Sequence, residues 1–161
     1  MEEPYISKEI MELLTAIYQN EIFQIVLKLV LITVLSGIIG YERQQQSKPA
    51  GFRTYILVAI SSVLVMECGN RLYSDIGADP TRIPAQLLSG IGFLGAGTIL
   101  RDGFNVKGLT TAAGLLAVTC IGLSIGAGFY LGGIVTTFIV YINLIVRLRI
   151  VCYNVYSFKN L

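Results

Sequence analysis

Histidine is absent from this sequence of 161 residues. The commonest metal ligand and the commonest general acid or base in proteins are therefore missing. The three cysteines, Cys68, Cys120 and Cys152, lie far apart and form no CxxC pair, so neither a zinc site nor a redox motif is indicated. We expect a protein that is not an enzyme and that carries no cofactor.

Charge is also scarce. Charged residues make up 14% of the chain and hydrophobic residues 54%, with a mean hydropathy of +0.70. A soluble domain carries about 25% charged residues. Such a deficit, combined with long uncharged runs, is typical of an integral membrane protein.

The apolar runs predict five membrane spans, because a crossing helix needs about 20 residues. The stretch from Gly108 to Val146 holds 39 residues without a charge. It is long enough for two spans, which we expect to be separated at Gly126-Ala127-Gly128. The other three runs are approximately residues 22–40, 54–70 and 83–100. The predicted fold is all-α, a compact bundle of five transmembrane helices over residues 22–148, and we expect no soluble domain after it.

Short segments flank this membrane domain. In residues 1–21, apolar residues share one helical face; these are Ile6, Ile10, Leu13, Leu14 and Ile17. This pattern fits an amphipathic helix lying at the membrane boundary and fits equally a helix that packs on the first span. Residues 149–161 are expected to form a short tail.

The basic residues predict the orientation. With the N-terminus outside, eight basic residues lie inside and three outside: Arg43, Lys48, Arg53, Arg101, Lys107, Arg147, Arg149 and Lys159 against Lys8, Arg71 and Arg82. We therefore expect the N-terminus outside the cell and the C-terminus in the cytoplasm.

Lys28 and Glu67 are the charged residues that fall clearly within spans. Each lies 13 residues from the inner end of its helix, Tyr41 or Thr54, or about 20 Å at 1.5 Å per residue. Equal depth on adjacent antiparallel helices allows a salt bridge. The alternative is that each side chain extends separately to the outer headgroups. Intramembrane charges are candidates for a functional site.

A glycine-rich segment occupies the third run. Gly90-Ile-Gly92-Phe-Leu-Gly95 matches G-x-G-x-x-G, but a dinucleotide site needs a preceding strand, a following helix and a later acid, and the sequence predicts none of these. Small residues allow close helix contact in lipid. We therefore predict helix packing, within the bundle or in a homodimer, through Ser89, Gly90, Gly92, Gly95, Ala96 and Gly97. So many glycines also allow a broken helix of the kind that forms transporter sites.

Polar residues gather on the predicted inner side. The inner polar cluster comprises Glu42, Arg43, Arg53, Arg101, Asp102, Asn105, Lys107 and Thr111. Arg101 and Asp102 could pair with Glu42 and Arg43 and lock the bundle, or the cluster could bind a partner or a lipid headgroup. The residues allow a weak Mg²⁺ site but do not indicate one. We predict no nucleic-acid partner.

Several motifs resemble the membrane domain of the MgtC/SapB/YhiD family. They are GIIGYERQ (37–44), AGFRT (50–54), RIPAQLLSGIGFLGAGTILRDGFNVKGLTTAAG (82–114) and Ile121-Gly122. The resemblance covers about residues 22–146. The positions that match the family pattern are Glu42, Arg43, Gly51, Arg53, Gln86, Gly90, Gly92, Gly95, Gly97, Arg101, Asn105, Gly108, Thr111 and Ala112.

This resemblance implies a multi-pass protein of the bacterial inner membrane, connected with magnesium homeostasis and virulence. It also implies a regulator that acts in low magnesium or acid stress, with the membrane ATP synthase as partner. MgtC-like members carry a C-terminal ACT-like domain, which this sequence does not contain. From the residues themselves two functions stay open. One is a non-enzymatic regulator that packs against a membrane partner or itself, and the other is a small transporter or channel for a divalent cation or protons.

Overall fold

The computed structural model describes residues 20–158, and describes side chains for residues 20–145. Its elements are five helices and one pair of short strands, in the order α2 (Glu21–Gln45), α3 (Phe52–Ile76), α4 (Arg82–Gly97), β1 (Leu100–Asp102), β2 (Asn105–Lys107), α5 (Leu109–Gly126) and α6 (Tyr130–Phe158). The predicted bundle of five helices is confirmed. The predicted N-terminal helix lies outside the described residues.

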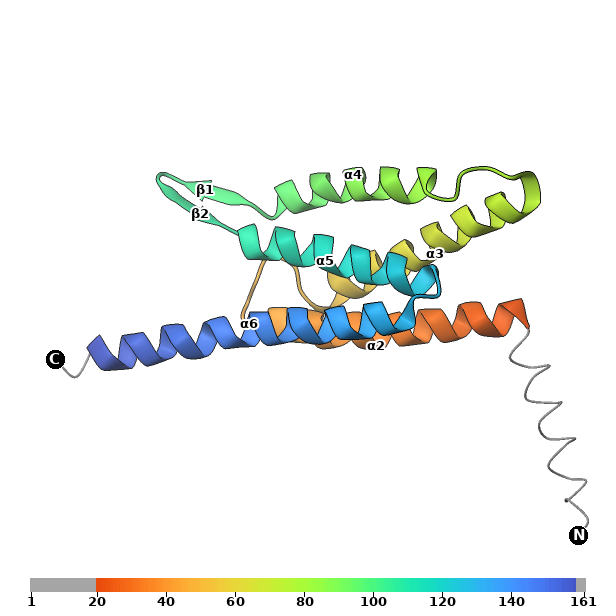
Figure 1. The fold of residues 1–161 in the computed structure, drawn as a ribbon. Helices are drawn as coiled ribbons and strands as arrows, with labels where there is room; N and C mark the ends of the chain where they lie inside the picture. The colour runs from red at the N-terminus through yellow and green to blue at the C-terminus, as the bar shows by residue number, and fades with distance from the viewer. Residues whose placement is uncertain (1–19, 159–161) are drawn as a thin grey trace, which may run out of the picture.

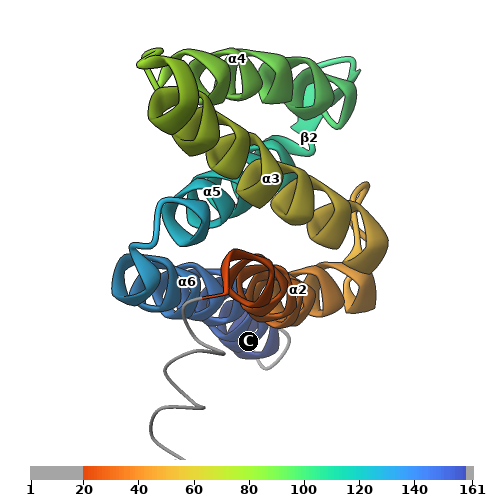
Figure 2. The same ribbon diagram turned by 90° about the vertical axis from the view of Figure 1, so that its right-hand side faces the viewer.

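The helices form three layers (Figures 1 and 2). Helix α4 is one outer layer, α3 and α5 form the middle, and α2 and α6 form the other outer layer. Helix α3 runs obliquely, so that it packs against α2, α4 and α5. Helix α5 packs against all four other helices and is therefore the centre of the bundle.

Three helices are long and apolar enough to cross a membrane: α2, α3 and α5. Helix α4 has 16 residues, about 24 Å at 1.5 Å per residue, and the apolar part of α6 that is described in full is Tyr130–Ile145. Helix α6 continues past the predicted boundary at residue 148 as far as Phe158. The orientation across the membrane stays a prediction.

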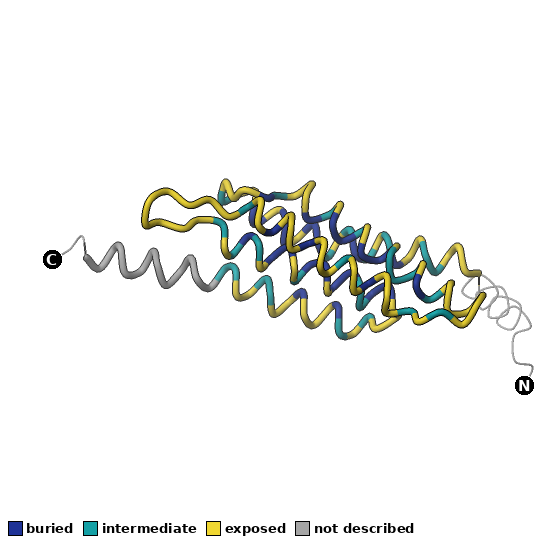
Figure 3. Tube along the Cα trace, turned by 90° about the horizontal axis from the view of Figure 1, so that it is seen from above, coloured by how far each residue is buried: buried dark blue, intermediate teal, exposed yellow. Residues whose placement is uncertain are grey.

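The core lies where α2, α3 and α5 meet, and Figure 3 shows the buried segments inside the bundle. Ile32, Ile39, Val63 and Val118 are among its fully buried apolar residues. The hydroxyls inside this core are satisfied locally, because each donates to the carbonyl four residues earlier; these are Ser36, Ser62 and Thr119. The core is therefore packed and internally hydrogen-bonded.

Close helix contacts are made by glycines of α2 and α5. A Cβ placed on Gly40 of α2 would lie 2.9 Å from the Cα of Phe52 on α3, and one on Gly122 of α5 would lie 2.7 Å from the carbonyl oxygen of Ala59. Small residues let two backbones approach in this way. Gly40 and Gly122 thus allow close helix contacts within the chain, and the packing role predicted for the glycines of α4 stays a prediction.

The third apolar run ends earlier than predicted. Helix α4 stops at Gly97, and Leu100 already belongs to a β-hairpin in which Leu100 pairs with Lys107 and Asp102 with Asn105. The polar link predicted between the third and fourth spans is this hairpin. The break predicted between the last two spans is confirmed, because α5 ends at Gly126 and Gly128 has a φ of +83°.

The turn before α4 is stabilised by Asp79. Its Oδ1 accepts hydrogen bonds from the backbone N–H of Thr81 at 2.9 Å and from the Thr81 hydroxyl at 2.7 Å. These hydrogen bonds favour the carboxylate and hold the pKa of Asp79 below its ordinary value. Residue 79 thereby fixes the start of the helix that carries the glycine-rich segment.

Candidate functional site

The charged side chains predicted within spans meet in the structure. Lys28 Nζ of α2 lies 2.5 Å from Glu67 Oε1 of α3 and donates a second hydrogen bond, of 2.9 Å, to the carbonyl of Gly126 at the end of α5. The side chains are 10% and 20% exposed. The pair therefore connects three helices at one end of the core, as the matched depths allowed.

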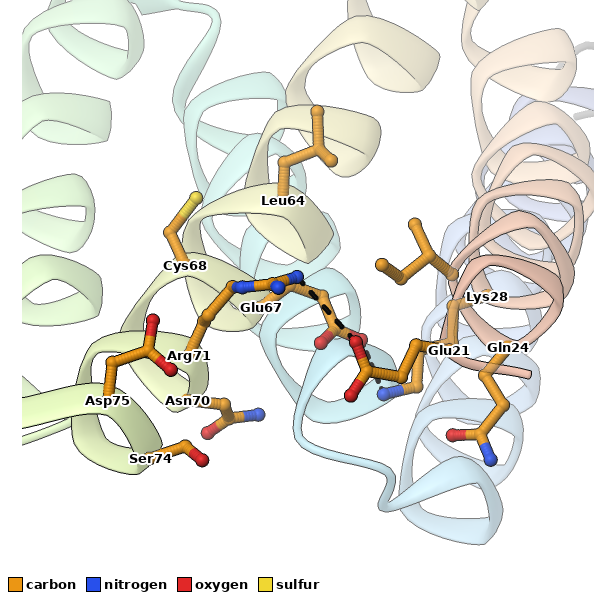
Figure 4. Close-up of a pocket in the computed structure, with 11 residues that line it drawn as sticks. Glu21, Gln24, Lys28, Leu64, Glu67, Cys68, Asn70, Arg71, Ser74 and Asp75 are labelled. Atoms are coloured by element: carbon orange, nitrogen blue, oxygen red, sulfur yellow. Dashed lines mark hydrogen bonds and ion pairs between the residues drawn. The ribbon is translucent and has the colours of Figure 1, made fainter. Parts of the chain in front are cut away.

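This ion pair forms the inner wall of a pocket between α2 and α3 (Figure 4). The pocket has a volume of about 450 Å³ and is lined by Glu21, Gln24, Ile25, Lys28, Leu64, Glu67, Cys68, Asn70, Arg71, Ser74 and Asp75. A second ion pair crosses it, with Arg71 Nη1 lying 3.7 Å from Glu21 Oε2. The lining is thus polar and of mixed charge, unlike the apolar surface around it.

The inner polar cluster is only partly assembled. Arg43 Nη2 of α2 donates a 3.3 Å hydrogen bond to the Thr111 hydroxyl of α5. Glu42 Oε2 lies 3.8 Å from Arg43 Nη1, and Gln46 donates to Glu42 Oε1. Tyr55 of α3, which is fully buried, also reaches this place and donates to the Thr111 carbonyl at 3.5 Å. Glu42, Arg43 and Thr111 therefore form a buried polar contact between helices.

The remaining members of that cluster lie apart from this contact. Arg53 is exposed in the first turn of α3, and the hairpin residues Arg101, Asp102, Asn105 and Lys107 are all exposed. Arg101 Nε donates to the Gly103 carbonyl at 3.2 Å. The structure therefore does not make the predicted cross-pairs between the hairpin and α2, and Arg43 pairs with its own neighbour instead. The reason is geometric, because the hairpin extends beyond the bundle (Figure 1).

Two buried atoms in this contact have no hydrogen-bond partner among the described residues, Glu42 Oε2 and Arg43 Nε. Buried polar atoms are normally satisfied, and water is a common partner. Arg43 lies about 22 Å from Lys28 along α2, since 15 residues separate the two positions. The two buried polar sites thus lie at opposite ends of the core.

The predicted packing residues of α4 divide by the face on which they lie. Gly95 is buried, and its Cβ position lies 3.5 Å from the Cβ of Ala112 on α5. Around Gly90, Gly92 and Gly97 no atom of the described residues lies within 4 Å of the Cβ position. Ser89 and Ala96 are exposed as well. Helix α4 therefore uses one narrow face within the chain and leaves Gly90, Gly92 and Gly97 uncovered by the described residues, with the exposed side chain of Phe93 between Gly90 and Gly97.

Some contacts were not identified from the sequence. Gly114 lies against Tyr55, with its Cβ position 2.3 Å from the Tyr55 hydroxyl oxygen, and Arg71 and Glu21 complete the pocket. The spacing of Gly114, Gly122 and Gly126 along α5 places them on one helix face, and this spacing could have indicated their close contacts. Among the described residues there is no group of three His, Cys, Asp or Glu side chains that could hold a metal ion.

The apolar helices, the buried ion pair and the packed polar contact define a multi-pass helical membrane protein. The MgtC family model matches residues 29–151. The chain therefore belongs to the MgtC family, whose relatives are bacterial membrane proteins, and it is a multi-pass protein of the inner membrane.

Curated relatives agree with this assignment. "Putative magnesium transporter YhiD" of Escherichia coli (strain K12) is 41% identical over 117 residues, covering 69% of this chain and 54% of the relative. "Protein MgtC" of Brucella abortus (strain 2308) is 43% identical over 115 residues, covering 71% and 48%. "Protein SapB" of Bacillus subtilis (strain 168) is 44% identical over 113 residues, covering 66% and 49%. The chain thus spans about half the length of the curated relatives it matches, and no solved structure matches it significantly.

Proposed function

We propose that this protein is a non-enzymatic regulator of the bacterial inner membrane that acts in low magnesium or acid stress by packing α4 against a membrane partner. By the family resemblance that partner is the ATP synthase. The single observation that carries the proposal is that the described residues leave three glycines of α4 uncovered. Around Gly90, Gly92 and Gly97 no described atom lies within 4 Å of the Cβ position.

The chemistry of this face suits a helix partner within the bilayer. Beside a glycine a partner helix can approach closely, the exposed Phe93 side chain offers it apolar surface, and in lipid such van der Waals contact drives association. The hairpin follows directly at the end of α4 and exposes Arg101, Asp102, Asn105 and Lys107. These groups would supply polar contacts to the same partner outside the hydrocarbon region. The apolar helix face and the polar hairpin thus form one continuous surface.

A growth assay tests this proposal in a strain that lacks the gene. We expect Gly92→Leu to fold at least as stably as the wild type, because its side chain enters open space and leucine favours the helix over glycine, yet to lose support of growth in low magnesium. Gly92→Ala is the matched control and should retain most of that support. Growth equal to wild type for Gly92→Leu, at equal amounts in the membrane, would contradict the proposal.

The second candidate function is transport of a divalent cation or protons. It is favoured by the buried Lys28–Glu67 pair at the base of a polar pocket, since charges inside a membrane commonly belong to ion pathways. A relative also bears the name magnesium transporter. Purified protein in liposomes should then pass Mg²⁺ or protons, and Lys28→Met should alter the flux. Liposomes that stay tight to both ions would exclude this candidate.

A further inference from the structure

We propose that the pocket between α2 and α3 binds the headgroup of a phosphoethanolamine lipid, whose phosphodiester and primary ammonium carry opposite charges. This site is separate from the α4 face. The headgroup site lies at the mouth of the pocket and is formed by Glu21, Arg71 and Asp75 together with Asn70 and Ser74. Lys28 and Glu67 close its inner wall.

The depth of the pocket matches the headgroup layer. Glu21 is the first residue of α2, and Arg71 and Asp75 lie in the last two turns of α3. Seven residues separate Glu21 from Lys28, or about 10 Å along the helix. Each headgroup layer of a bilayer is about 5–7 Å thick outside a hydrocarbon core of about 30 Å. A pocket that runs from the helix ends down to Lys28 therefore passes through this layer to the edge of the core.

Exposed apolar side chains are close in sequence to the residues of the mouth. Ile22, Phe23, Leu72 and Ile76 are exposed next to the charged residues. In a bilayer these side chains contact acyl chains. A headgroup in the pocket can therefore keep its acyl chains in the surrounding lipid, and this favours a lipid over a soluble ligand.

Arg71 is placed to receive the phosphodiester. Its side chain is 69% exposed and its partner Glu21 is 81% exposed, with 3.7 Å between the charged atoms. An ion pair so exposed and so long is weak, so the guanidinium can turn to a phosphate at little cost. Arginine is suited to this role because its planar N–H groups bind two phosphate oxygens at once.

The carboxylates of the mouth are placed to receive the ammonium. Glu67 already binds Lys28, but Asp75 has no ion pair among the residues with described side chains, and lies on the side of Arg71 away from Glu21 in Figure 4. The lining holds three carboxylates, of Glu21, Glu67 and Asp75, and two cations, of Lys28 and Arg71. Its net charge of −1 favours a ligand that brings a positive group.

The same chemistry distinguishes headgroups. A primary ammonium donates three hydrogen bonds to carboxylates, whereas the methylated ammonium of phosphocholine donates none. Phosphoglycerol lacks a positive group and is negatively charged, so the net negative lining disfavours it. The expected order of affinity is phosphoethanolamine, then phosphocholine, then phosphoglycerol.

Native mass spectrometry of the full chain, released from nanodiscs that contain the three lipids in equal amounts, tests this proposal. We expect phosphoethanolamine lipid to be retained about fivefold more than phosphocholine lipid, as the loss of one good hydrogen-bonding contact implies. Asp75→Asn should reduce this preference, because the ammonium loses a carboxylate, whereas Arg71→Gln should lower the retention of all three lipids, because each carries the phosphodiester. The matched controls Arg101→Gln and Asp102→Asn make the same changes at exposed positions of the hairpin and should leave it unchanged.

Several results would overturn the proposal. One is equal retention of the three lipids by the wild-type chain. Another is a preference that Asp75→Asn keeps together with a total retention that Arg71→Gln keeps, because the lipid would then be bound elsewhere. A third is displacement of the retained lipid by soluble glycerophosphoethanolamine at equal concentration, because the acyl chains would then contribute nothing and the occupant would be a soluble compound.

Discussion

Lys28 Nζ lies 2.5 Å from Glu67 Oε1, although 39 positions separate the two residues in the chain. The same ammonium group donates to the Gly126 carbonyl. One side chain of α2 therefore binds both α3 and the end of α5. Since removal of water from a charge is costly unless the charge is paired, this contact constrains how the three helices align.

Lys28→Met should destabilise the protein, because it leaves the Glu67 carboxylate mostly buried without its partner. We expect a loss of about 3 kcal/mol in the free energy of unfolding, measured by denaturant titration in detergent micelles. Replacing both residues, as Lys28→Glu with Glu67→Lys, should recover much of this loss but not the hydrogen bond to Gly126. A double variant no more stable than the single variants would contradict the pairing.

Gly122→Ala should weaken the contact between α3 and α5. Its Cβ would lie 2.7 Å from the Ala59 carbonyl oxygen, and relief of such overpacking costs about 1–3 kcal/mol. Gly90→Ala is the matched control, since its Cβ meets no described atom within 4 Å, and it should gain up to about 1 kcal/mol in helix propensity. The two substitutions should therefore change the free energy of unfolding in opposite directions, and changes in the same direction would contradict the packing of Gly122 against α3.

Thr111→Val should destabilise the polar contact at the other end of the core. It removes the hydroxyl that accepts the 3.3 Å hydrogen bond from Arg43 and leaves a buried donor unpaired, at a cost of about 1–3 kcal/mol. Thr111→Ser retains the hydroxyl and should recover most of the stability. Equal losses for both variants would show that the threonine methyl group, and not its hydroxyl, matters.

Gly108→Ala should disrupt the junction between the hairpin and α5. Gly108 has a φ of +92°, and its Cβ would lie 1.8 Å from the Thr98 carbonyl oxygen. Gly103→Ala is a suitable control, because φ there is +58° and no described atom lies within 4 Å. That control should cost only about 1–2 kcal/mol for the left-handed backbone. Protease cleavage at the hairpin should increase strongly for the first variant and little for the second.

The sequence predicted the parts of the fold that depend on hydrophobicity. Uncharged runs located the helices, the glycines at 126 and 128 located the last turn, and the matched depths of Lys28 and Glu67 allowed their pairing as one of two alternatives. Each of these follows from the length and charge of a single segment or from a simple comparison of two segments.

Contacts that depend on helix rotation could not be predicted in the same way. Gly92 and Gly122 both lie in small-residue segments, yet Gly122 faces α3 while the described residues leave Gly92 uncovered. Which face of a helix turns inward depends on how all its neighbours pack, and an uncharged helix shows little difference between its faces. The hairpin at Leu100–Lys107 was missed because its polar residues also fit an irregular link.

The functional roles of the α4 face and of the hairpin residues stay predictions. The most direct test is site-specific photo-crosslinking in membranes from a probe at position 92, with a probe at the buried position 95 as the control. We expect position 92 to give an adduct with a second membrane protein, whereas position 95, which faces Ala112, should react within the chain. Adducts from position 92 with lipid alone would contradict the central claim that α4 binds a membrane partner.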